Sequence, residues 1–375
     1  MLRLIIIVVF FLLSLLTLFP APAMFLWYAA IIVTEFSWVF MLVSLGLFVW
    51  AFRDKKLKVP GLTLSLAAFF LYAIPLLQAS QLSARLDTEM ARAFGNGNAG
   101  GNPAPYSFFR MFKRSGKEAP YDVLLYDSVH KLTLDYYTPE IKGHPAKIFK
   151  NPCVVVVHGG SWKGGDSRQL PELNSVLAGN GYNVASINYR KAPECQSPAP
   201  VQDLHNALVF LRANAEHLNI DNSRFVLLGR SAGGQIALLG AYTLKGMGIK
   251  GVISYYGPAD MIWGYKNPAV IYNSCKVLED YIGGTYDEFP NAYLASSPVE
   301  AVNSSTVPTL LIHGKNDVLV SYYHSPRLIE RLNKYNVPNY LLTLPWATHG
   351  CDYTLKGPSG QLATYTVERF LESVF

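Results

Sequence analysis

The chain has 375 residues, of which 50% are hydrophobic, and its formal net charge is +6 at pH 7. The basic residues are scattered and form neither a long run nor a nucleic-acid-binding motif, which argues against nucleic acid as a partner. The length suffices for one sizeable α/β domain with additional segments. Because the hydrophobic excess falls within the first 80 residues, we expect the N-terminal region to differ in kind from the remainder.

Residues 1–80 are expected to form a transmembrane region of two or three apolar helices. The run from Leu4 to Phe19 follows a positive charge and precedes a Pro-Ala-Pro-Ala segment. It is therefore either a signal peptide that ends at Ala23 or a retained first helix. The second apolar run, Met24 to Trp50, is long enough to span a membrane, and a third extends from Gly61 to Leu77.

Four basic residues between the second and third runs predict the orientation in the membrane. Loops rich in Lys and Arg stay in the cytoplasm, so the third run leads outward and the domain after it faces away from the cytoplasm. The prediction is the same whether the first run is cleaved or retained. The four residues are Arg53, Lys55, Lys56 and Lys58.

Residues 81–120 are expected to connect the membrane region to a catalytic domain. From Gln78 to Phe94, apolar residues recur at every fourth position, the pattern of an amphipathic helix. A linker rich in Gly, Asn and Pro follows from Gly95 to Pro105. The aromatic and basic segment from Tyr106 to Arg114 is expected either to lie on the bilayer surface or to pack beneath the domain.

Residues 121–375 carry the pattern of an α/β domain. Two alternating runs, Tyr121–Asp127 and Lys131–Tyr137, predict an antiparallel hairpin. Six further apolar runs separated by helical stretches predict a buried, mostly parallel sheet, with the active site at the carboxyl ends of the strands. These runs are Cys153–Val157, Val184–Asn188, Phe225–Leu228, Gly251–Tyr255, Thr309–Ile312 and Tyr340–Leu344.

A Gly-Arg-Ser-Ala-Gly segment directly after the run Phe225–Leu228 makes Ser231 the candidate nucleophile. At a strand-to-helix turn, this motif holds the serine hydroxyl on a sharp, exposed turn. A serine hydroxyl needs an adjacent base, for which His349 is the candidate. Asp317 follows the run Thr309–Ile312 and is the candidate that orients the imidazole. The chain order Ser, Asp, His is the one that the α/β-hydrolase topology imposes.

The segment 158–162, with the sequence His-Gly-Gly-Ser-Trp, follows another predicted strand. Small residues at such a place let backbone N–H groups point into the site. The N–H groups of Gly160 and Ser161, together with that of Ala232, are therefore the candidate oxyanion hole.

Further residues near these motifs are candidate contacts or supports. Trp162, Arg230 and Trp263 are candidate substrate contacts. His158 and His313 are interpreted as structural hydrogen-bonding residues, because His349 already supplies the base.

The excursion at 257–306 is a possible cap over the site, with aromatic side chains lining an acyl or aryl pocket. The alternative is a surface excursion that packs on itself. The aromatic residues concerned are Trp263, Tyr265, Tyr272, Tyr281, Tyr286 and Phe289.

These motifs resemble the α/β-hydrolase superfamily, and more narrowly its carboxylesterase branch with hormone-sensitive-lipase-like and feruloyl-esterase-like enzymes. The resemblance covers residues 121–375. It implies an α/β-hydrolase fold and ester hydrolysis by Ser231, Asp317 and His349 without a metal or cofactor. Segment 158–162 reads HGGSW where typical hormone-sensitive-lipase relatives have HGGG, and the DPL-type segment that precedes the catalytic acid in those relatives is absent. Both differences favour the feruloyl-esterase-like or formamidase-like enzymes. The matched residues are 158–162, Gly165, Asp166, Tyr189, Arg190, Ala192–Glu194, Pro198, Ala199, Asp203, 229–234, His313, Gly314, Asp317, Val320, His349 and Gly350.

The sequence thus predicts a membrane-anchored serine hydrolase that cleaves a small-molecule or lipid ester through an acyl-enzyme intermediate. An amidase or formamidase with the same triad is the first alternative, and a non-catalytic binding protein on this fold is the second. If the domain is exported, a disulfide among Cys195, Cys275 and Cys351 is possible, and free thiols are the alternative. The oligomeric state is left open.

Overall fold

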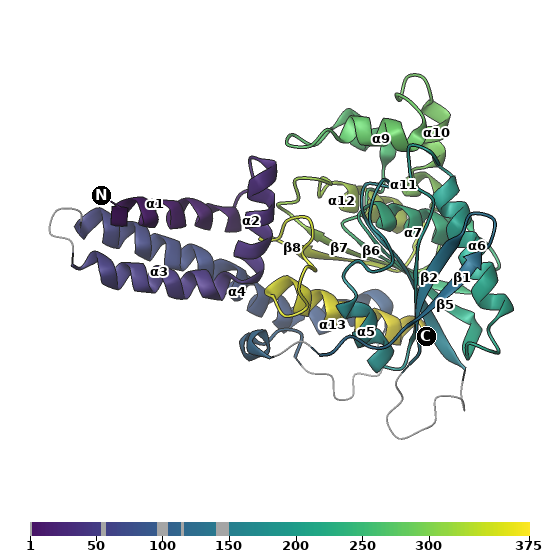
Figure 1. Cartoon of the computed structure of the whole chain (residues 1–375), viewed down its shortest axis with the longest axis horizontal. Coiled ribbons are helices and arrows are strands. Elements are labelled where there is room, and N and C mark those ends of the chain that lie inside the picture. Colours follow the sequence, from purple (N-terminus) through teal and green to yellow (C-terminus); the bar gives the residue numbers. More distant parts are fainter. Residues whose placement is uncertain (1, 54–57, 96–103, 114–115, 140–149) are drawn as a thin grey trace.

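The structure is a computed structural model in which a helical bundle projects from a larger α/β domain (Figure 1). Lys55, Lys56 and most of the linker expected at 95–105 lie outside the described residues. The structure describes residues 2–53, 58–95, 104–113, 116–139 and 150–375.

The domain is built on one sheet of eight strands in the order β1-β2-β4-β3-β5-β6-β7-β8. The pairs β1–β2 and β2–β4 are antiparallel, and the pairs from β4 through β8 are parallel. The predicted hairpin and mostly parallel sheet are confirmed. The strands are β1 (Asp122–Asp127), β2 (Leu132–Tyr137), β3 (Asn151–Val157), β4 (Asn183–Ile187), β5 (Ile220–Arg230), β6 (Ile249–Tyr255), β7 (Thr309–Gly314) and β8 (Asn339–Leu344).

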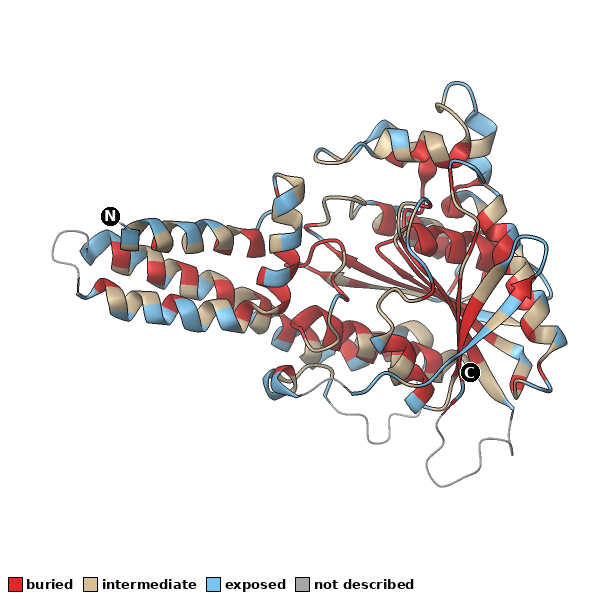
Figure 2. Ribbon diagram, in the orientation of Figure 1, coloured by how far each residue is buried: buried red, intermediate tan, exposed pale blue. Residues whose placement is uncertain are grey.

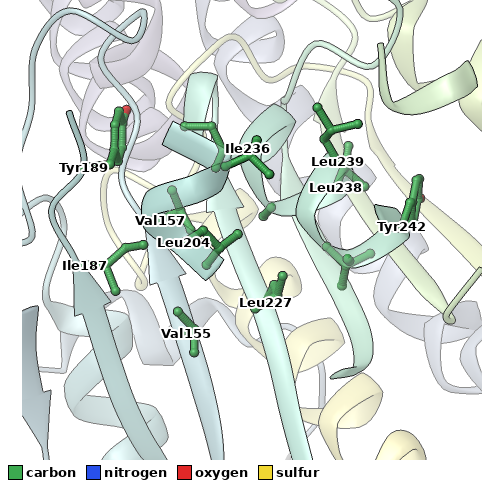
Figure 3. Packing of buried hydrophobic residues seen from close by; sticks show 14 of the residues in the cluster. Val155, Val157, Ile187, Tyr189, Leu204, Leu227, Ile236, Leu238, Leu239 and Tyr242 are labelled. Atoms are coloured by element: carbon green, nitrogen blue, oxygen red, sulfur yellow. The ribbon is translucent and has the colours of Figure 1, made fainter. Parts of the chain in front are cut away.

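Helices cover both faces of this sheet (Figure 1), and the residues of its central strands β3, β5 and β6 are buried except near their N-terminal ends. Alternate residues of a strand point to opposite faces. Val155 and Val157 therefore pack with Leu204 and Ile236 on one face (Figure 3), whereas Val154 packs on the other. The helices are α5 (Glu172–Gly179), α6 (Ala199–Ala213), α7 (Ala232–Thr243), α8 (Met261–Lys266), α9 (Ser274–Ile282), α10 (Pro290–Ala295), α11 (Pro298–Ala301), α12 (His324–Lys334) and α13 (Pro358–Val374).

The N-terminal region forms four helices: α1 (Leu2–Ser14, extended by a 3-10 turn), α2 (Met24–Glu35), α3 (Ser37–Ala51) and α4 (Lys58–Phe94). Among the described residues, α4 is long and apolar enough to cross a membrane by itself, whereas α2 and α3 pass that test only together. They meet at an angle of 87°, which corrects the expectation of one span from Met24 to Trp50. The bend coincides with Glu35, whose carboxylate accepts a hydrogen bond from the Ser359 backbone N–H at 3.2 Å.

Helix α4 joins the third apolar run and the amphipathic segment in one helix of 37 residues, about 55 Å long. The expected domain boundary at residue 80 therefore falls inside a helix, because residues 77–81 contain no glycine or proline to end it. Leu82, Leu86 and Met90 are buried against the sheet and α13. The apolar face predicted for the segment from Gln78 to Phe94 is thus the face of α4 that packs against the α/β domain.

The bundle of α1, α3 and the first half of α4 is held by few polar contacts. The Tyr72 hydroxyl of α4, for example, donates to the Phe10 carbonyl of α1 at 2.7 Å. Figure 2 shows many exposed residues on its outer faces. Large apolar side chains are exposed there, at Leu2, Ile5, Val9, Leu12, Leu42, Leu45, Val49, Val59, Leu66 and Phe70.

Near the domain, a short 3-10 helix (Phe108–Phe112) covers part of the aromatic segment predicted at 106–114. Its Phe112 ring lies 4.6 Å from the ring of Trp38 in α3, and Phe109 is exposed. The segment therefore lies beside the point where α3 begins.

Candidate active site

Ser231 lies on the turn between β5 and α7, with a backbone φ of 53°. This strained conformation is found at nucleophile turns, where it exposes the serine hydroxyl. Two glycines make the turn possible because a Cβ atom would have no room at either. At Gly229 it would lie 2.0 Å from the Gly233 carbonyl oxygen, and at Gly233 it would lie 2.2 Å from that of Val157.

The structure brings Ser231, His349 and Asp317 into one hydrogen-bonded chain. The Ser231 hydroxyl lies 3.0 Å from His349 Nε2. On the other side of the ring, His349 Nδ1 lies 2.7 Å from Asp317 Oδ2. This is the geometry in which an imidazole takes a proton from the serine while a carboxylate holds the ring.

The Asp317 carboxylate is fully buried and satisfied on both oxygens. Oδ1 accepts the backbone N–H groups of Leu319 and Val320, each at 2.9 Å, and Oδ2 also lies 3.2 Å from His313 Nε2. Burial by itself raises the pKa of Asp317, but the charge of His349 and the hydrogen bonds from both histidines outweigh it. The pKa is therefore held well below its ordinary value, and the carboxylate stays ionised.

The segment of the predicted oxyanion hole lies against the nucleophile. Gly160, Ser161 and Ala232 line the same cavity as Ser231 and His349. Gly160 and Ser161 have positive φ values of 119° and 56°, and the value at Ser161 is uncommon for a residue other than glycine. The backbone N–H of the preceding residue, Gly159, is not part of the predicted oxyanion hole, because it donates to Gln169 Oε1 at 2.6 Å.

His158 and His313 have the structural contacts that were expected of them. His158 stacks on Tyr189 at 4.3 Å between ring centroids, and burial lowers its pKa to about 4. His313 Nδ1 lies 2.7 Å from the Ser325 hydroxyl, and its other nitrogen faces Asp317. Neither ring is in hydrogen-bond contact with Ser231, whereas His313 supports the acid.

Arg230, Asp352 and Tyr256 form a buried polar network next to His349, which was not predicted from the sequence. Arg230 Nε donates to Asp352 at 2.5 Å, and the Tyr256 hydroxyl donates to the other oxygen of that carboxylate, also at 2.5 Å. The Tyr256 ring lies 4.3 Å from the His349 ring. Arg230, predicted as a substrate contact, thus lines the cavity with its charge already paired to Asp352. Asp352 carries no local sequence signal that pairs it with a residue 122 positions away.

A cavity of about 570 Å³ opens above Ser231. Trp162 lines it while donating through Nε1 to Gln235 at 3.0 Å. Trp263, which was also predicted as a substrate contact, does not line the cavity. Its backbone N–H donates to the Asp260 carboxylate at the start of α8, and its indole ring packs against His324.

Part of the excursion at 257–306 lines the cavity, and part of it packs on itself. Its segment from Pro258 to Leu278 supplies part of the cavity wall, including Tyr272, whose hydroxyl lies 2.7 Å from that of Ser161. Tyr265 and Tyr286 instead pack on Tyr293 within the excursion.

Another part of the wall comes from residues that were predicted to belong to the membrane region. Trp27, Tyr28, Ile31 and Ile32 of α2 all line the cavity. Their sequence pattern is uniformly apolar and does not reveal a face turned toward a catalytic domain.

All four cysteines are free thiols in the structure, at Cys153, Cys195, Cys275 and Cys351. Among the described residues, no group of three or more His, Cys, Asp or Glu side chains is arranged to hold a metal ion.

Comparison with known families gives one match that covers slightly more than half of the chain. The BD-FAE family model matches residues 134–332, from β2 to near the end of α12. The match includes the segment 158–162, Ser231 and Asp317.

Two curated relatives come from Mycobacterium tuberculosis. Esterase LipC is 27% identical over 60% of this chain and 58% of its own length. The probable carboxylic ester hydrolase LipM is 24% identical over 93% of this chain and 86% of its own length, so its similarity extends into the N-terminal helices. The chain thus spans less than two thirds of LipC and most of LipM.

Solved structures show the same fold at lower sequence identity. A structure titled bacterial heroin esterase has a TM-score of 0.60 at 22% identity, over 71% of this chain and 87% of that chain. A truncated carbohydrate esterase from gut microbiota has a TM-score of 0.58 at 21% identity, over 70% of this chain and all of that chain. The catalytic domain therefore has the α/β-hydrolase fold.

Proposed function

We propose that this chain, which belongs to the BD-FAE family, is a membrane-anchored serine esterase that cleaves carboxylic esters through an acyl-enzyme intermediate. The observation that carries the proposal is the hydrogen-bonded chain Ser231–His349–Asp317 on the turn after β5. The names of LipC and LipM favour esters over amides as the bond that is cleaved.

In the acylation step, His349 Nε2 takes the proton of Ser231 as the serine oxygen attacks the ester carbonyl. Asp317 stays ionised and stabilises the imidazolium through Nδ1. The carbonyl oxygen becomes an oxyanion that accepts hydrogen bonds from the backbone N–H groups of Ser161 and Ala232, with Gly160 contributing beside them. The intermediate then collapses, and His349 gives its proton to the leaving alcohol.

In the deacylation step, water takes the place of the alcohol. His349 removes a proton from the water, whose oxygen attacks the acyl carbonyl on Ser231. Collapse of the second tetrahedral intermediate breaks the bond to the serine oxygen, which regains its proton from His349. The products are the free acid and the original enzyme, and every proton transfer uses a residue of this chain.

The N-terminal bundle supports membrane anchoring. Its exposed outer faces are apolar, and such faces are rare in soluble proteins unless they meet a membrane or a partner. The start of α1, the end of α3 and the start of α4 lie at the end of the bundle far from the catalytic domain (Figure 1). Because Arg53 closely follows the end of α3 and Lys58 begins α4, the positive-inside rule orients the catalytic domain away from the cytoplasm.

The packing of the bundle also supports retention of the first helix. The Thr17 hydroxyl of the 3-10 turn after α1 donates to the Leu71 carbonyl of α4 at 3.2 Å, and Ile7 packs near Gly61. Cleavage at Ala23 would remove these partners of α4. We therefore assign α1 to the mature protein.

The catalytic part of the proposal is tested with the purified full-length protein in detergent. Ser231→Ala is expected to abolish turnover of p-nitrophenyl acetate while the circular dichroism spectrum stays that of the wild type. Turnover of the matched anilide by the wild type at a rate equal to the ester would instead favour the amidase alternative. Wild-type turnover in Ser231→Ala would refute Ser231 as the nucleophile.

The anchoring part is tested in membranes from an expressing bacterium. The protein is expected to remain in the pellet after alkaline carbonate extraction, and a C-terminal alkaline phosphatase fusion is expected to be active. Release of the protein by carbonate would contradict anchoring. An inactive phosphatase fusion, together with an active cytoplasmic reporter at the same position, would contradict the orientation.

A further inference from the structure

Helix α2 belongs to the N-terminal region, but it packs directly against the catalytic domain. It crosses the end of the bundle where α1 ends and α3 begins (Figure 1). The Trp27 indole donates to the His349 carbonyl at 2.9 Å, and Glu35 accepts from Ser359 at the start of α13. The two ends of α2 are thus tied to two different segments of the domain.

One face of this helix is part of the catalytic cavity. Trp27, Tyr28, Ile31 and Ile32 occupy positions i, i+1, i+4 and i+5, which lie together on one side of an α-helix. They line the same cavity as Ser231. The volume of about 570 Å³ falls in the range of about 300–1,000 Å³ of pockets that enclose a small-molecule ligand.

The lining of the cavity is mainly apolar, with a smaller number of polar residues such as Asn267, Ser274 and Ser321. Besides those of α2, its apolar side chains include Met261, Val277, Leu278 and Leu319. The ester bond must lie beside Ser231 and His349, which line the same cavity. A mainly apolar lining around these reacting groups suits a substrate with one polar ester group and a long apolar chain.

The mouth of the cavity lies at the outer edge of α2. Tyr28 and Ile32 line the cavity and are nevertheless 59% and 48% exposed, so they form its rim. Phe25, on the same helix but not part of the lining, is 73% exposed. If the bundle spans the membrane, this rim lies at the level of the lipid head groups, where aromatic residues are favoured.

From these observations we propose that α2 is the binding wall for the apolar chain of the substrate, and that the substrates are lipid esters with a long chain. The inference rests on the proposed esterase function and adds its substrate class. Each methylene removed from water strengthens binding about fourfold, so a wall that holds several of them governs chain-length preference.

The test compares kcat/KM for long-chain and short-chain esters in mixed micelles. One pair varies the acyl side, with p-nitrophenyl dodecanoate and p-nitrophenyl acetate. The other varies the alcohol side, with dodecyl acetate and ethyl acetate. In Ile32→Trp, which fills the rim, the long-to-short ratio of at least one pair is expected to fall about tenfold or more. The pair that responds identifies which side of the ester lies along α2.

Two further variants control the experiment. Tyr28→Ala removes a ring from the rim instead of adding one, and its long-to-short ratio is expected to fall at least about threefold. Phe25→Ala changes an exposed aromatic residue of the same helix outside the cavity and is expected to keep the wild-type ratio.

Ratios within about twofold of the wild type in both rim variants would overturn the role of α2 while leaving the esterase proposal intact. Absence of any ester turnover by the wild type would instead refute the esterase proposal itself.

Discussion

The indole nitrogen of Trp27 and the backbone carbonyl of His349 are joined by a hydrogen bond of 2.9 Å across 322 positions of the chain. One residue lies in a helix that leads into the apolar bundle, and the other is the proposed catalytic base. The N-terminal helices are therefore joined to the catalytic domain in two ways: through the continuous helix α4, and through this contact between α2 and the segment of the catalytic base.

We expect Trp27→Phe to lower kcat for p-nitrophenyl acetate by about two- to tenfold. It keeps an aromatic ring but removes a hydrogen bond, which contributes about 0.5–1.5 kcal/mol, and a tenfold change in rate corresponds to about 1.4 kcal/mol. Trp50→Phe, at the far end of the bundle, is the matched control and is expected to keep the wild-type kcat. Equal rates for the two variants would contradict a positioning role for Trp27.

The ionised state of Asp317 makes stability depend on pH. Its pKa in the folded protein is depressed below the value of about 3.9 expected for an unfolded chain. The carboxylate therefore stabilises the fold above about pH 4, and this contribution is lost as the pH falls through the folded-state pKa. We expect the free energy of unfolding of the wild type to drop below about pH 4, and Asp317→Asn to show a flatter dependence in urea titrations. Parallel curves would contradict this role.

Much of the site was predictable because its signals are local. Ser231 and Asp317 lie within a few residues of the ends of predicted strands, and each strand is a short apolar run with clear ends. The contacts between Arg230 and Asp352, and between Trp27 and His349, join residues 122 and 322 positions apart. Hydrophobic periodicity reports only on neighbours along the chain, so it carries no information about such pairs.

The bend between α2 and α3 was missed for a related reason. The run from Met24 to Trp50 is apolar on all sides and contains no proline, so its pattern favours one straight helix. The bend is accompanied by the contact of Glu35 with Ser359, which is a tertiary interaction. An ionisable residue inside an apolar run was the one local hint of such a contact.

Gly233→Ala is expected to destabilise the protein by about 1–3 kcal/mol and to remove most of its activity. The added methyl group would lie 2.2 Å from the Val157 carbonyl oxygen and would push the turn of Ser231 away from β3. Gly179→Ala is the control, because a Cβ at that exposed glycine meets no atom within 4 Å. Thermal unfolding and esterase assays on both variants check the prediction, which a wild-type result for Gly233→Ala would contradict.

The buried pair of Arg230 and Asp352 is expected to be far more sensitive than a surface pair. Asp352→Asn leaves the Arg230 charge buried without a counter-charge, which costs about 3–5 kcal/mol. The double variant Arg230→Met/Asp352→Leu removes both charges and is expected to recover much of this loss. Glu216→Gln, which breaks the exposed pair with Lys150, is expected to cost less than about 1 kcal/mol. Urea unfolding measures all three, and equal losses for Asp352→Asn and Glu216→Gln would contradict the prediction.

The central claim is that Ser231 is the nucleophile, and covalent labelling with a fluorophosphonate tests it most directly. The full-length protein in detergent is treated with the reagent, digested and analysed by mass spectrometry, while esterase activity is followed in parallel. We predict one phosphonyl group on the peptide that contains Ser231, formed at the rate at which activity is lost, and no such adduct in Ser231→Ala. Loss of activity with the adduct on another residue, or full activity after complete labelling of Ser231, would contradict the account.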